Sequence, residues 1–332
     1  MKEHTSFKVG GTVSHCMEIK TEKDLLAFAD MRKKLFLPAR IIGGGTNILF
    51  ADTLSPMIVG VMKTKGVRII GDDVDNTIIA VSAGEVWDDV VAFSVVQNLS
   101  GAELLSAIPG TAGATPIQNV GAYGREVKDI LVSVKTFNLE DTTYRIWTND
   151  ECQFGYRTSI FKQKDMQKYV ITEITLILKK VIPEFPKYKD VKKYFEERKI
   201  QNPSSKEIRE AIIAIRKNKL PDPSVIPNVG SFFKNPHINR HEGERLKTEY
   251  SDIPLYEAPG DLFKVSAGWL IERAGFKGMD IGSVGVYEKN ALVLYNKRNA
   301  SFLDVMVAQK VVAEKVKSMF GIEIEMEPVI VE

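Results

Sequence analysis

The feature that most constrains the fold of this chain is a long segment without charge, Ala107–Gly124. It reads AIPGTAGATPIQNVGAYG and contains four glycines, two prolines and no charged residue. An uncharged loop of this length is typical of a segment that covers a ligand or a partner surface. We therefore expect a binding loop here.

A second glycine-rich turn, GGGTN at residues 43–47, follows the strand-like residues Ala39–Ile42. Glycines let a backbone approach an anion closely, and successive N–H groups can form an anion-binding nest. The turn matches neither the dinucleotide fingerprint nor the P-loop, and alone it would more often be structural. Together the two segments favour a long ligand with a diphosphate, such as FAD. Neither contains His or Cys, so we expect FAD to be bound without a covalent link.

Composition excludes several classes of protein. The 332 residues suggest two domains or three small ones. The net charge of +2 argues against a nucleic-acid protein held mainly by charge. No apolar run reaches the ~18 residues of a membrane span, and the N-terminus lacks the apolar core of a signal peptide. Cys16 and Cys152 are the only cysteines and there are four histidines without an HExxH pattern, so we expect no metal site and a reducing cytosol.

Periodicity and capping residues predict an α+β chain. Thr21 and Asp24 favour a helix start, and a second helix is expected over about Glu85–Asn98, with Val86, Val90, Phe93 and Val96 on its inner side. Lys187–Lys199, dense in charge, indicates a solvated surface segment for most of its residues. The remaining expected elements are strands at Ile58–Val61, Val67–Ile70, Thr77–Ala83, Val132–Phe137, Thr143–Trp147, Val170–Leu178, Ala291–Tyr295 and Ile322–Val331, and helices from Ser204, over about Ala267–Ala274 and over Ser301–Met319.

Five motifs occur in a familiar order: GGGTN, IPGTAGATPIQNVGAYG, YRTSIF (Tyr156–Phe161), GSFFKNP (Gly230–Pro236) and SAGWLIE (Ser266–Glu272). Together they closely resemble the UDP-N-acetylenolpyruvoylglucosamine reductases, flavoenzymes of peptidoglycan precursor synthesis. The resemblance covers nearly the whole chain. GGGTN alone is shared with many flavin enzymes of the vanillyl-alcohol oxidase type.

The resemblance implies an α+β fold with an FAD-binding module of the vanillyl-alcohol oxidase type in two lobes and a smaller substrate-binding domain. The first lobe would comprise residues 1–60 joined by the C-terminal strand 322–332, and the second lobe residues 61–218. The substrate-binding domain would comprise residues 219–321. Leu220–Asn228, rich in proline and turn residues, suits a boundary.

The FAD-binding residues implied by the resemblance come from the two glycine-rich segments. They are Gly43, Gly44, Gly45, Thr46, Asn47, Pro109, Gly110, Ala112, Gly113, Ala114, Gln118, Asn119, Gly121, Ala122, Tyr123 and Gly124.

Three catalytic residues follow from matching the family motifs. Arg157 matches the arginine that polarises the substrate carboxylate, a task suited to a guanidinium. Ser231 matches the proton donor. Glu327 matches an acidic residue that helps to stabilise the enolic intermediate, but Pro328 stands where the family has valine, so Glu325 is the alternative in a shifted register.

The substrate would be a UDP-sugar. Lys219 and Asn235 match family substrate contacts, and Arg216 is a neighbouring cation. Tyr188 matches the tyrosine of a mobile loop that closes over the nucleotide, which places the chain with the longer class of the family. Asn290 lies near a further substrate contact.

The implied activity is NADPH-dependent reduction of UDP-N-acetylglucosamine enolpyruvate to UDP-N-acetylmuramate through FAD. This step supplies cell wall synthesis and so cell shape and cell division. We expect a cytoplasmic monomer without nucleic-acid or membrane partners. Two alternatives remain: another FAD-dependent oxidase or dehydrogenase of the same fold, or a flavin-binding module without turnover.

Overall fold

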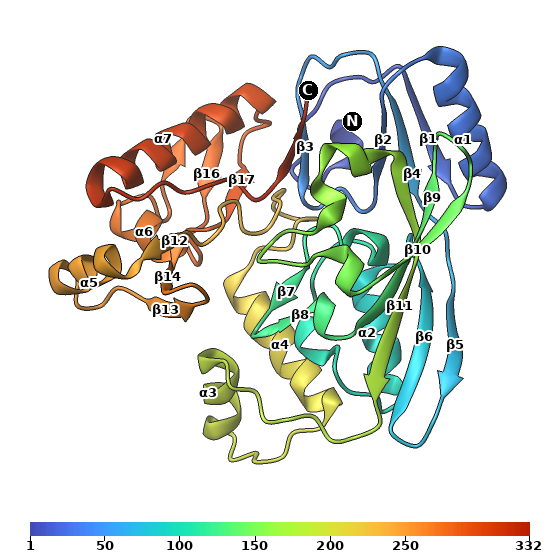
Figure 1. The fold of residues 1–332 in the computed structure, drawn as a ribbon. Coiled ribbons are helices and arrows are strands. Elements are labelled where there is room, and N and C mark those ends of the chain that lie inside the picture. The colour runs from blue at the N-terminus through green and yellow to red at the C-terminus, as the bar shows by residue number, and fades with distance from the viewer. The chain divides into compact units, whose positions relative to one another are not determined.

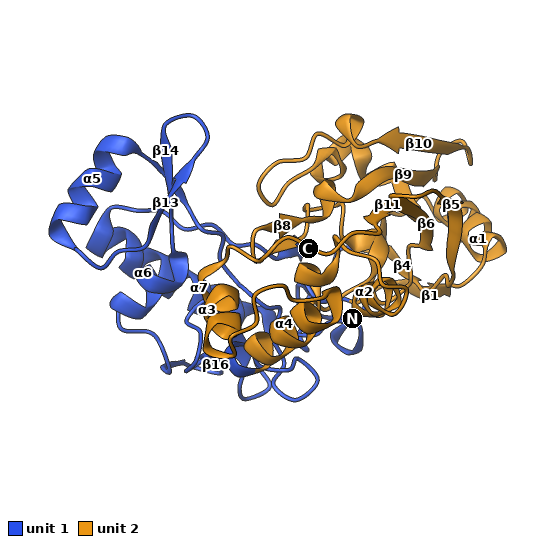
Figure 2. Ribbon diagram, turned by 90° about the horizontal axis from the view of Figure 1, so that it is seen from below, with its two compact units in different colours: residues 1–12, 45–55, 218–332 blue, residues 13–44, 56–217 orange.

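The computed structural model describes residues 1–332 and contains two compact units (Figure 2). Unit 1 comprises residues 1–12, 45–55 and 218–332, and unit 2 comprises residues 13–44 and 56–217. The border at 217/218 lies one residue from the expected border at 218/219. The three-part organisation of lobes and substrate domain stays a prediction.

Unit 2 contains a parallel three-stranded sheet in the order β1-β4-β2 (Figure 1). Its strands are β1 (His15–Ile19), β2 (Ala39–Ile42) and β4 (Ile58–Met62). Helix α1 (Glu22–Leu35) connects β1 to β2 and begins at the predicted capping box, in which Thr21 and Asp24 satisfy each other's backbone N–H groups. The helix buries Leu25, Phe28 and Ala29 against the sheet.

The second sheet of unit 2 is antiparallel, in the order β10-β9-β11-β6-β5. Its strands are β5 (Val67–Asp72), β6 (Asn76–Ser82), β9 (Leu131–Asn138), β10 (Tyr144–Thr148) and β11 (Tyr169–Lys179). All five were predicted to within two residues at either end, since each carries the apolar residues of a strand. Both sheets share one hydrophobic core.

Helix α2 (Trp87–Val96) packs on this core with part of the predicted face, because Val90 is buried and Phe93 packs against the core as expected. Trp87, Val90 and Val91 are buried, whereas Val86 is 41% and Val96 is 74% exposed. Trp87 sets the rotation of the helix, because its indole is fully buried and its Nε1–H donates to the carbonyl of Leu105 at 3.0 Å.

Two helices at the end of unit 2 form a small core of their own. Helix α4 (Ser205–Lys219) begins after the predicted capping pair Ser204 and Glu207. Helix α3 (Lys189–Glu197) lies in the segment expected to be solvated, and it buries Val191 and Phe195 against α4. The short strands β7 (Gly121–Ala122) and β8 (Arg125–Glu126) complete the unit.

Unit 1 contains three small sheets and three helices. The sheets have the orders β12-β14-β13, β15-β16-β17 and β18-β3. Their strands are β3 (Ile48–Phe50), β12 (His237–Asn239), β13 (Leu255–Ala258), β14 (Leu262–Val265), β15 (Asp280–Ile281), β16 (Val284–Val286), β17 (Leu294–Asn296) and β18 (Val329–Val331). The helices are α5 (Arg240–Glu249), α6 (Ala267–Arg273) and α7 (Phe302–Phe320).

The C-terminal segment is the clearest departure from the predicted elements. A strand was expected over Ile322–Val331, but β18 spans only Val329–Val331 and pairs in parallel with β3. Before it, Met326 forms an isolated antiparallel bridge with Phe233. The pairing partner therefore changes at Pro328, which has no N–H to continue a ladder.

No helix of the structure is long and apolar enough to cross a membrane.

The core beneath α1 makes a direct test of this packing. Phe28 is fully buried, and Phe28→Ala should lower the free energy of unfolding by about 3–5 kcal/mol because it leaves a cavity. Denaturant unfolding measures the change. Phe36, at the end of the same helix, is 92% exposed, and Phe36→Ala should change the free energy little. Equal losses in the two variants would show that this core is wrongly described.

Candidate functional site

The first half of the Ala107–Gly124 loop is fastened by its backbone to the turn between β6 and α2. The N–H of Trp87 donates to the carbonyl of Gly110 at 3.0 Å, and the N–H of Ala112 donates to the carbonyl of Glu85 at 2.8 Å. The N–H of Gly113 donates to the carbonyl of Ala83 at 2.9 Å. This half of the loop, whose only regular element is the 3-10 turn Ala112–Ala114, thus pairs its peptide groups with a neighbouring segment, as a strand would.

The two glycine-rich segments approach each other within unit 2. A Cβ atom on Gly43 would lie 2.1 Å from Oγ1 of Thr111, so only glycine fits there without movement of the loop. A Cβ atom on Gly113 would lie 2.5 Å from the Cβ of Ala83. The contact at Gly43 brings the start of GGGTN against Thr111 in the PGTAG part of the loop, and the contact at Gly113 brings the loop against the residue that follows β6.

The second half of the loop is held by the buried side chain of Asn119, which is fully inaccessible. Its Nδ2 donates to Oε2 of Glu126 at 2.9 Å and to the carbonyl of Gly155 at 3.2 Å, and its Oδ1 accepts from the N–H of Lys128 at 3.2 Å. Ser159 adds a hydrogen bond from its hydroxyl to the carbonyl of Ile117 at 2.7 Å. The loop is therefore tied to the YRTSIF segment.

Arg157 lies in this tied region. Its Nη2 donates to the carbonyl of Gly121 at 2.9 Å, and Nζ of Lys162 donates to the carbonyl of Arg157 at 3.0 Å. The backbone of Arg157 is left-handed, with φ of +54°. The predicted catalytic arginine thus touches the end of the predicted FAD loop.

Two aromatic rings and a cation gather at that end of the loop. The rings of Tyr123 and Tyr188 pack edge to face with centroids 5.2 Å apart. Arg216 hydrogen-bonds to the phenol of Tyr123. Burial lowers the pKa of the Arg216 guanidinium, and burial likewise raises the pKa of Tyr123. A desolvated cation beside the loop is suited to an anionic ligand.

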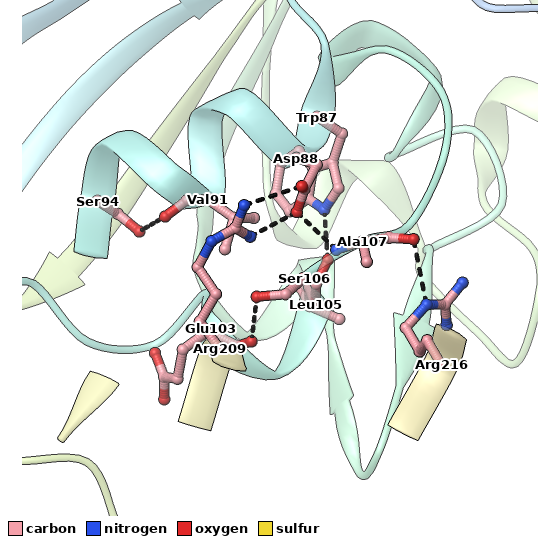
Figure 3. Close-up of polar contacts among 10 residues, drawn as sticks. All are labelled: Trp87, Asp88, Val91, Ser94, Glu103, Leu105, Ser106, Ala107, Arg209 and Arg216. Atoms are coloured by element: carbon pink, nitrogen blue, oxygen red, sulfur yellow. Dashed lines mark hydrogen bonds and ion pairs between the residues drawn. The ribbon is translucent and has the colours of Figure 1, made fainter. Parts of the chain in front are cut away.

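Figure 3 shows two residues here that the sequence analysis did not select, Asp88 of α2 and Arg209 of α4. They form an ion pair with two hydrogen bonds of 2.5 and 2.9 Å. A sequence signal existed, because Arg209 and Arg216 stand seven residues apart and so share one face of a helix.

In unit 1, the GSFFKNP segment carries Ser231 on a firmly held backbone. The side-chain oxygen of buried Asn228 accepts the N–H of Gly230 at 2.8 Å, which fixes the turn before the serine. Phe232 and Phe233 are almost fully buried directly after it. The N–H of Phe232 donates to the carbonyl of Leu292 at 2.7 Å.

The same segment pairs with the C-terminal segment. The N–H of Glu327 donates to the carbonyl of Phe232 at 2.9 Å, and the N–H of Lys234 donates to the carbonyl of Glu325 at 2.9 Å. This register places the Glu327 backbone next to the residue that follows Ser231.

The two candidate glutamates have different surroundings. The side chain of Glu325 is 76% exposed and pairs with Nζ of Lys234 at 2.9 Å. Glu327 is partly buried, and Nδ2 of Asn47 donates to its carbonyl at 3.5 Å.

The remaining predicted residues of unit 1 have the following positions. The carbonyl of Gly45 accepts the N–H of Ser6 at 3.0 Å, and the carbonyl of Asn47 accepts the N–H of Val329 at 3.0 Å. Oδ1 of Asn235 accepts the N–H of Ala267 at 2.9 Å, at the start of α6. Oδ1 of Asn290 accepts the N–H of Leu292 at 3.1 Å.

Thr46 lies between Gly45 and Asn47, and exposed Lys219 is the last residue of α4. Gly44, in unit 2, is exposed. No group of three or more His, Cys, Asp or Glu side chains in the structure could hold a metal ion.

Residues 13–146 match the family of FAD binding domains, and residues 222–331 match the C-terminal domain of UDP-N-acetylenolpyruvoylglucosamine reductase. The close approach of Gly43 to Thr111 joins the two glycine-rich segments, and the backbone N–H groups of such segments suit the diphosphate of FAD. The chain is therefore an FAD-dependent oxidoreductase, and the predicted α+β fold with an FAD-binding module is confirmed.

Relatives identify the family. The chain is 40% identical over 314 residues to UDP-N-acetylenolpyruvoylglucosamine reductase of Bdellovibrio bacteriovorus, covering 94% of this chain and 92% of that protein. It is 37% identical to the enzyme of the same name from Pseudomonas aeruginosa, covering 99% and 98%. The chain belongs to the family of UDP-N-acetylenolpyruvoylglucosamine reductases. This confirms the predicted role as a reductase in peptidoglycan precursor synthesis.

A solved structure supports the fold. The crystal structure of UDP-N-acetylenolpyruvylglucosamine reductase from Thermus caldophilus superposes with a TM-score of 0.69 at 22% identity, covering 100% of this chain and 97% of that one.

The contact between Gly43 and Thr111 predicts a specific effect on FAD. Gly43→Ala should weaken FAD binding by about tenfold or more, because overpacking of about 1–3 kcal/mol must be relieved by moving the loop. The measurement is titration of the flavin-free protein with FAD, followed by flavin fluorescence.

The double variant Gly43→Ala/Thr111→Ala should recover most of the affinity, because the clashing hydroxyl is gone. Gly71→Ala is the control, since its Cβ would meet Ile78 at an ordinary 3.4 Å. A double variant that binds FAD no better than Gly43→Ala would refute a clash through Thr111.

Proposed function

We propose that this chain catalyses the NADPH-dependent reduction of UDP-N-acetylglucosamine enolpyruvate to UDP-N-acetylmuramate. The observation that carries the proposal is the pairing between the segments of Ser231 and Glu327, with the Glu327 N–H 2.9 Å from the Phe232 carbonyl. A proton donor and an acidic residue held in adjacent backbone positions suit the protonation of an enolic intermediate. Membership of the reductase family supports the substrate.

FAD would be held without a covalent bond by the residues of GGGTN and of the 107–124 loop. Gly43 and Gly113 provide the closest approach of the backbone, and neither segment contains His or Cys. The chemistry supplied by bound FAD is the transfer of two electrons, as hydride, from NADPH to the terminal carbon of the enolpyruvyl ether.

Arg157 would bind the substrate carboxylate. Addition to the alkene places negative charge on the carboxylate as the enolate develops, and a donor aimed at that charge lowers the barrier. The Nη2 contact with Gly121 holds the guanidinium beside the loop, and the left-handed backbone of Arg157 is itself fixed by Lys162.

Ser231 would donate the proton to the carbon next to the carboxylate. A serine hydroxyl is a weak acid, but an enolate is a strong base, which reduces the mismatch. The backbone is held on both sides of Ser231, by Asn228 at Gly230 and by Leu292 at Phe232.

Glu327 would stabilise the enolic intermediate, and we assign this role to it in preference to Glu325. The partly buried position of Glu327 next to the serine segment supports the choice. Glu325 is exposed and already neutralised by Lys234.

The nucleotide of the substrate would be contacted by Tyr188, Arg216, Lys219, Asn235 and Asn290. Tyr188 packs on Tyr123, and its presence supports a place in the longer class of the family. The desolvated guanidinium of Arg216 supports a role near the diphosphate. We propose that the chain acts on this substrate as a monomer in the cytoplasm.

Ser231→Ala separates the two halves of the reaction. Reduction of the flavoprotein by NADPH needs no proton from Ser231 and should remain near normal. Reoxidation by the enolpyruvyl substrate should slow by about two to four orders of magnitude, the usual contribution of a positioned acid. Single-turnover absorbance without oxygen measures both steps, and Ser231→Cys should retain more activity because a thiol can donate.

Two glutamate variants form a matched pair for the same measurement. Glu327→Gln should slow reoxidation and spare reduction, whereas Glu325→Gln should be nearly silent, since an exposed ion pair contributes little. If Ser231→Ala is reoxidised at the wild-type rate, Ser231 is not the proton donor. If Glu327→Gln is also reoxidised at the wild-type rate, another residue stabilises the enolic intermediate.

A further inference from the structure

Ala107, the first residue of the FAD loop, has an unusual backbone. Its φ is +56°, in the left-handed region that alanine rarely adopts. Both of its peptide groups have side-chain partners. The N–H donates to Oδ1 of Asp88 at 2.5 Å, and the carbonyl accepts from Nε of Arg216 at 3.1 Å (Figure 3).

Asp88 is oriented by Arg209. The two side chains meet through paired hydrogen bonds of 2.5 and 2.9 Å, and the Arg209 side chain is only 15% exposed. Paired hydrogen bonds fix the plane of a carboxylate as well as its distance. Burial pushes the pKa of Asp88 upward, but the hydrogen bonds from Arg209 and Ala107 outweigh it and hold this pKa below its ordinary value.

Arg216 connects the start of the loop with its far end. Besides the carbonyl of Ala107 it hydrogen-bonds to Tyr123. Arg209 and Arg216 stand on the same helix, α4. Helices α2 and α4 therefore hold both ends of the loop from outside its own sequence.

We propose that Asp88, oriented by Arg209, is a positioning residue for FAD: it fixes Ala107 in the left-handed conformation from which the loop enters the cofactor site. The proposal rests on the assignment of the 107–124 loop to FAD. Two residues past Ala107 the chain reaches Pro109 and Gly110, and Gly110 accepts the N–H of Trp87. A different conformation at Ala107 would redirect the chain before that contact.

The test compares FAD dissociation constants of flavin-free proteins, measured by flavin fluorescence. Asp88→Ala removes the acceptor of the Ala107 N–H and should weaken FAD binding about tenfold, as expected for a lost charged hydrogen bond. Adding Ala107→Gly should restore much of the affinity, because glycine adopts positive φ without strain. Ala107→Gly alone is the reference for the double variant, and Asp88→Ala should weaken FAD binding less in this background than in the wild type.

The rescue distinguishes positioning from general stability. If Asp88 only stabilised the packing of α2 on α4, glycine at position 107 would not restore binding. Glu151→Ala is the matched control, because the Glu151 carboxylate has the same kinds of partner as Asp88. It accepts from Arg145 at 3.1 Å and from the backbone N–H of Thr148 at 2.8 Å. Glu151→Ala should bind FAD as tightly as the wild type.

Two outcomes overturn the proposal: undiminished FAD affinity in Asp88→Ala, or a loss that Ala107→Gly does not relieve. Should Asp88→Ala fail to fold, Arg209→Lys replaces it. Lysine keeps the charge but cannot form both hydrogen bonds with Asp88. We therefore expect a smaller loss of FAD affinity, which Ala107→Gly again relieves. Unchanged FAD affinity in Arg209→Lys overturns the proposal. Wild-type protein that binds no FAD would instead contradict the assignment of the cofactor.

Discussion

A long segment with little regular structure can be buried only if its peptide groups find partners, and the loop 107–124 of unit 2 is subject to that constraint. The loop 107–124 meets it from three sides. Its first half pairs with the turn before α2, and its second half is satisfied by the amide of Asn119. At its start, Asp88 of α2 and Arg216 of α4 hold the peptide groups of Ala107, and Arg216 also contacts Tyr123 near its end. The charged groups that contact this uncharged loop therefore come from neighbouring helices.

In unit 1, too, the residues proposed to act on the substrate are held in place by other residues. Ser231 is a small polar residue between a turn fixed by Asn228 and two buried phenylalanines. The phenylalanines anchor the segment in the core, and backbone pairing with the C-terminal segment adds Glu327 beside it. Residues that would do chemistry are thus placed by residues that only pack or hydrogen-bond.

Local signals allowed much of this architecture to be predicted. In each of the capping pairs that begin at Thr21 and Ser204, the two residues are three apart in sequence. Such a pair can therefore be predicted without knowledge of the tertiary structure. The predicted inner face of α2 was correct at Val90 and Phe93 but wrong at Val86 and Val96, because the buried indole of Trp87 sets the rotation of the helix. The predicted final strand was too long, because the C-terminal segment changes its pairing partner at Pro328.

The residues of the candidate site also differ in whether the sequence alone reveals them. The glycine segments were visible in the sequence because close approach demands a residue without Cβ, as Gly43 illustrates. Asp88 carried no sequence signal, since alone it is an ordinary charge on a helix, and the seven-residue spacing of Arg209 and Arg216 shows a shared helix face but not what that face contacts. Their role arises only when α2 and α4 meet at Ala107.

The most direct test of the account is amide hydrogen exchange of the protein with and without FAD, followed by mass spectrometry of its peptides. If the two glycine-rich segments form the cofactor site, bound FAD should slow exchange in peptides that cover residues 43–47 and 107–124. The exposed strand β10 (Tyr144–Thr148) should exchange at the same rate in both states. Protection elsewhere in the chain, with none in either glycine-rich segment, would contradict the account.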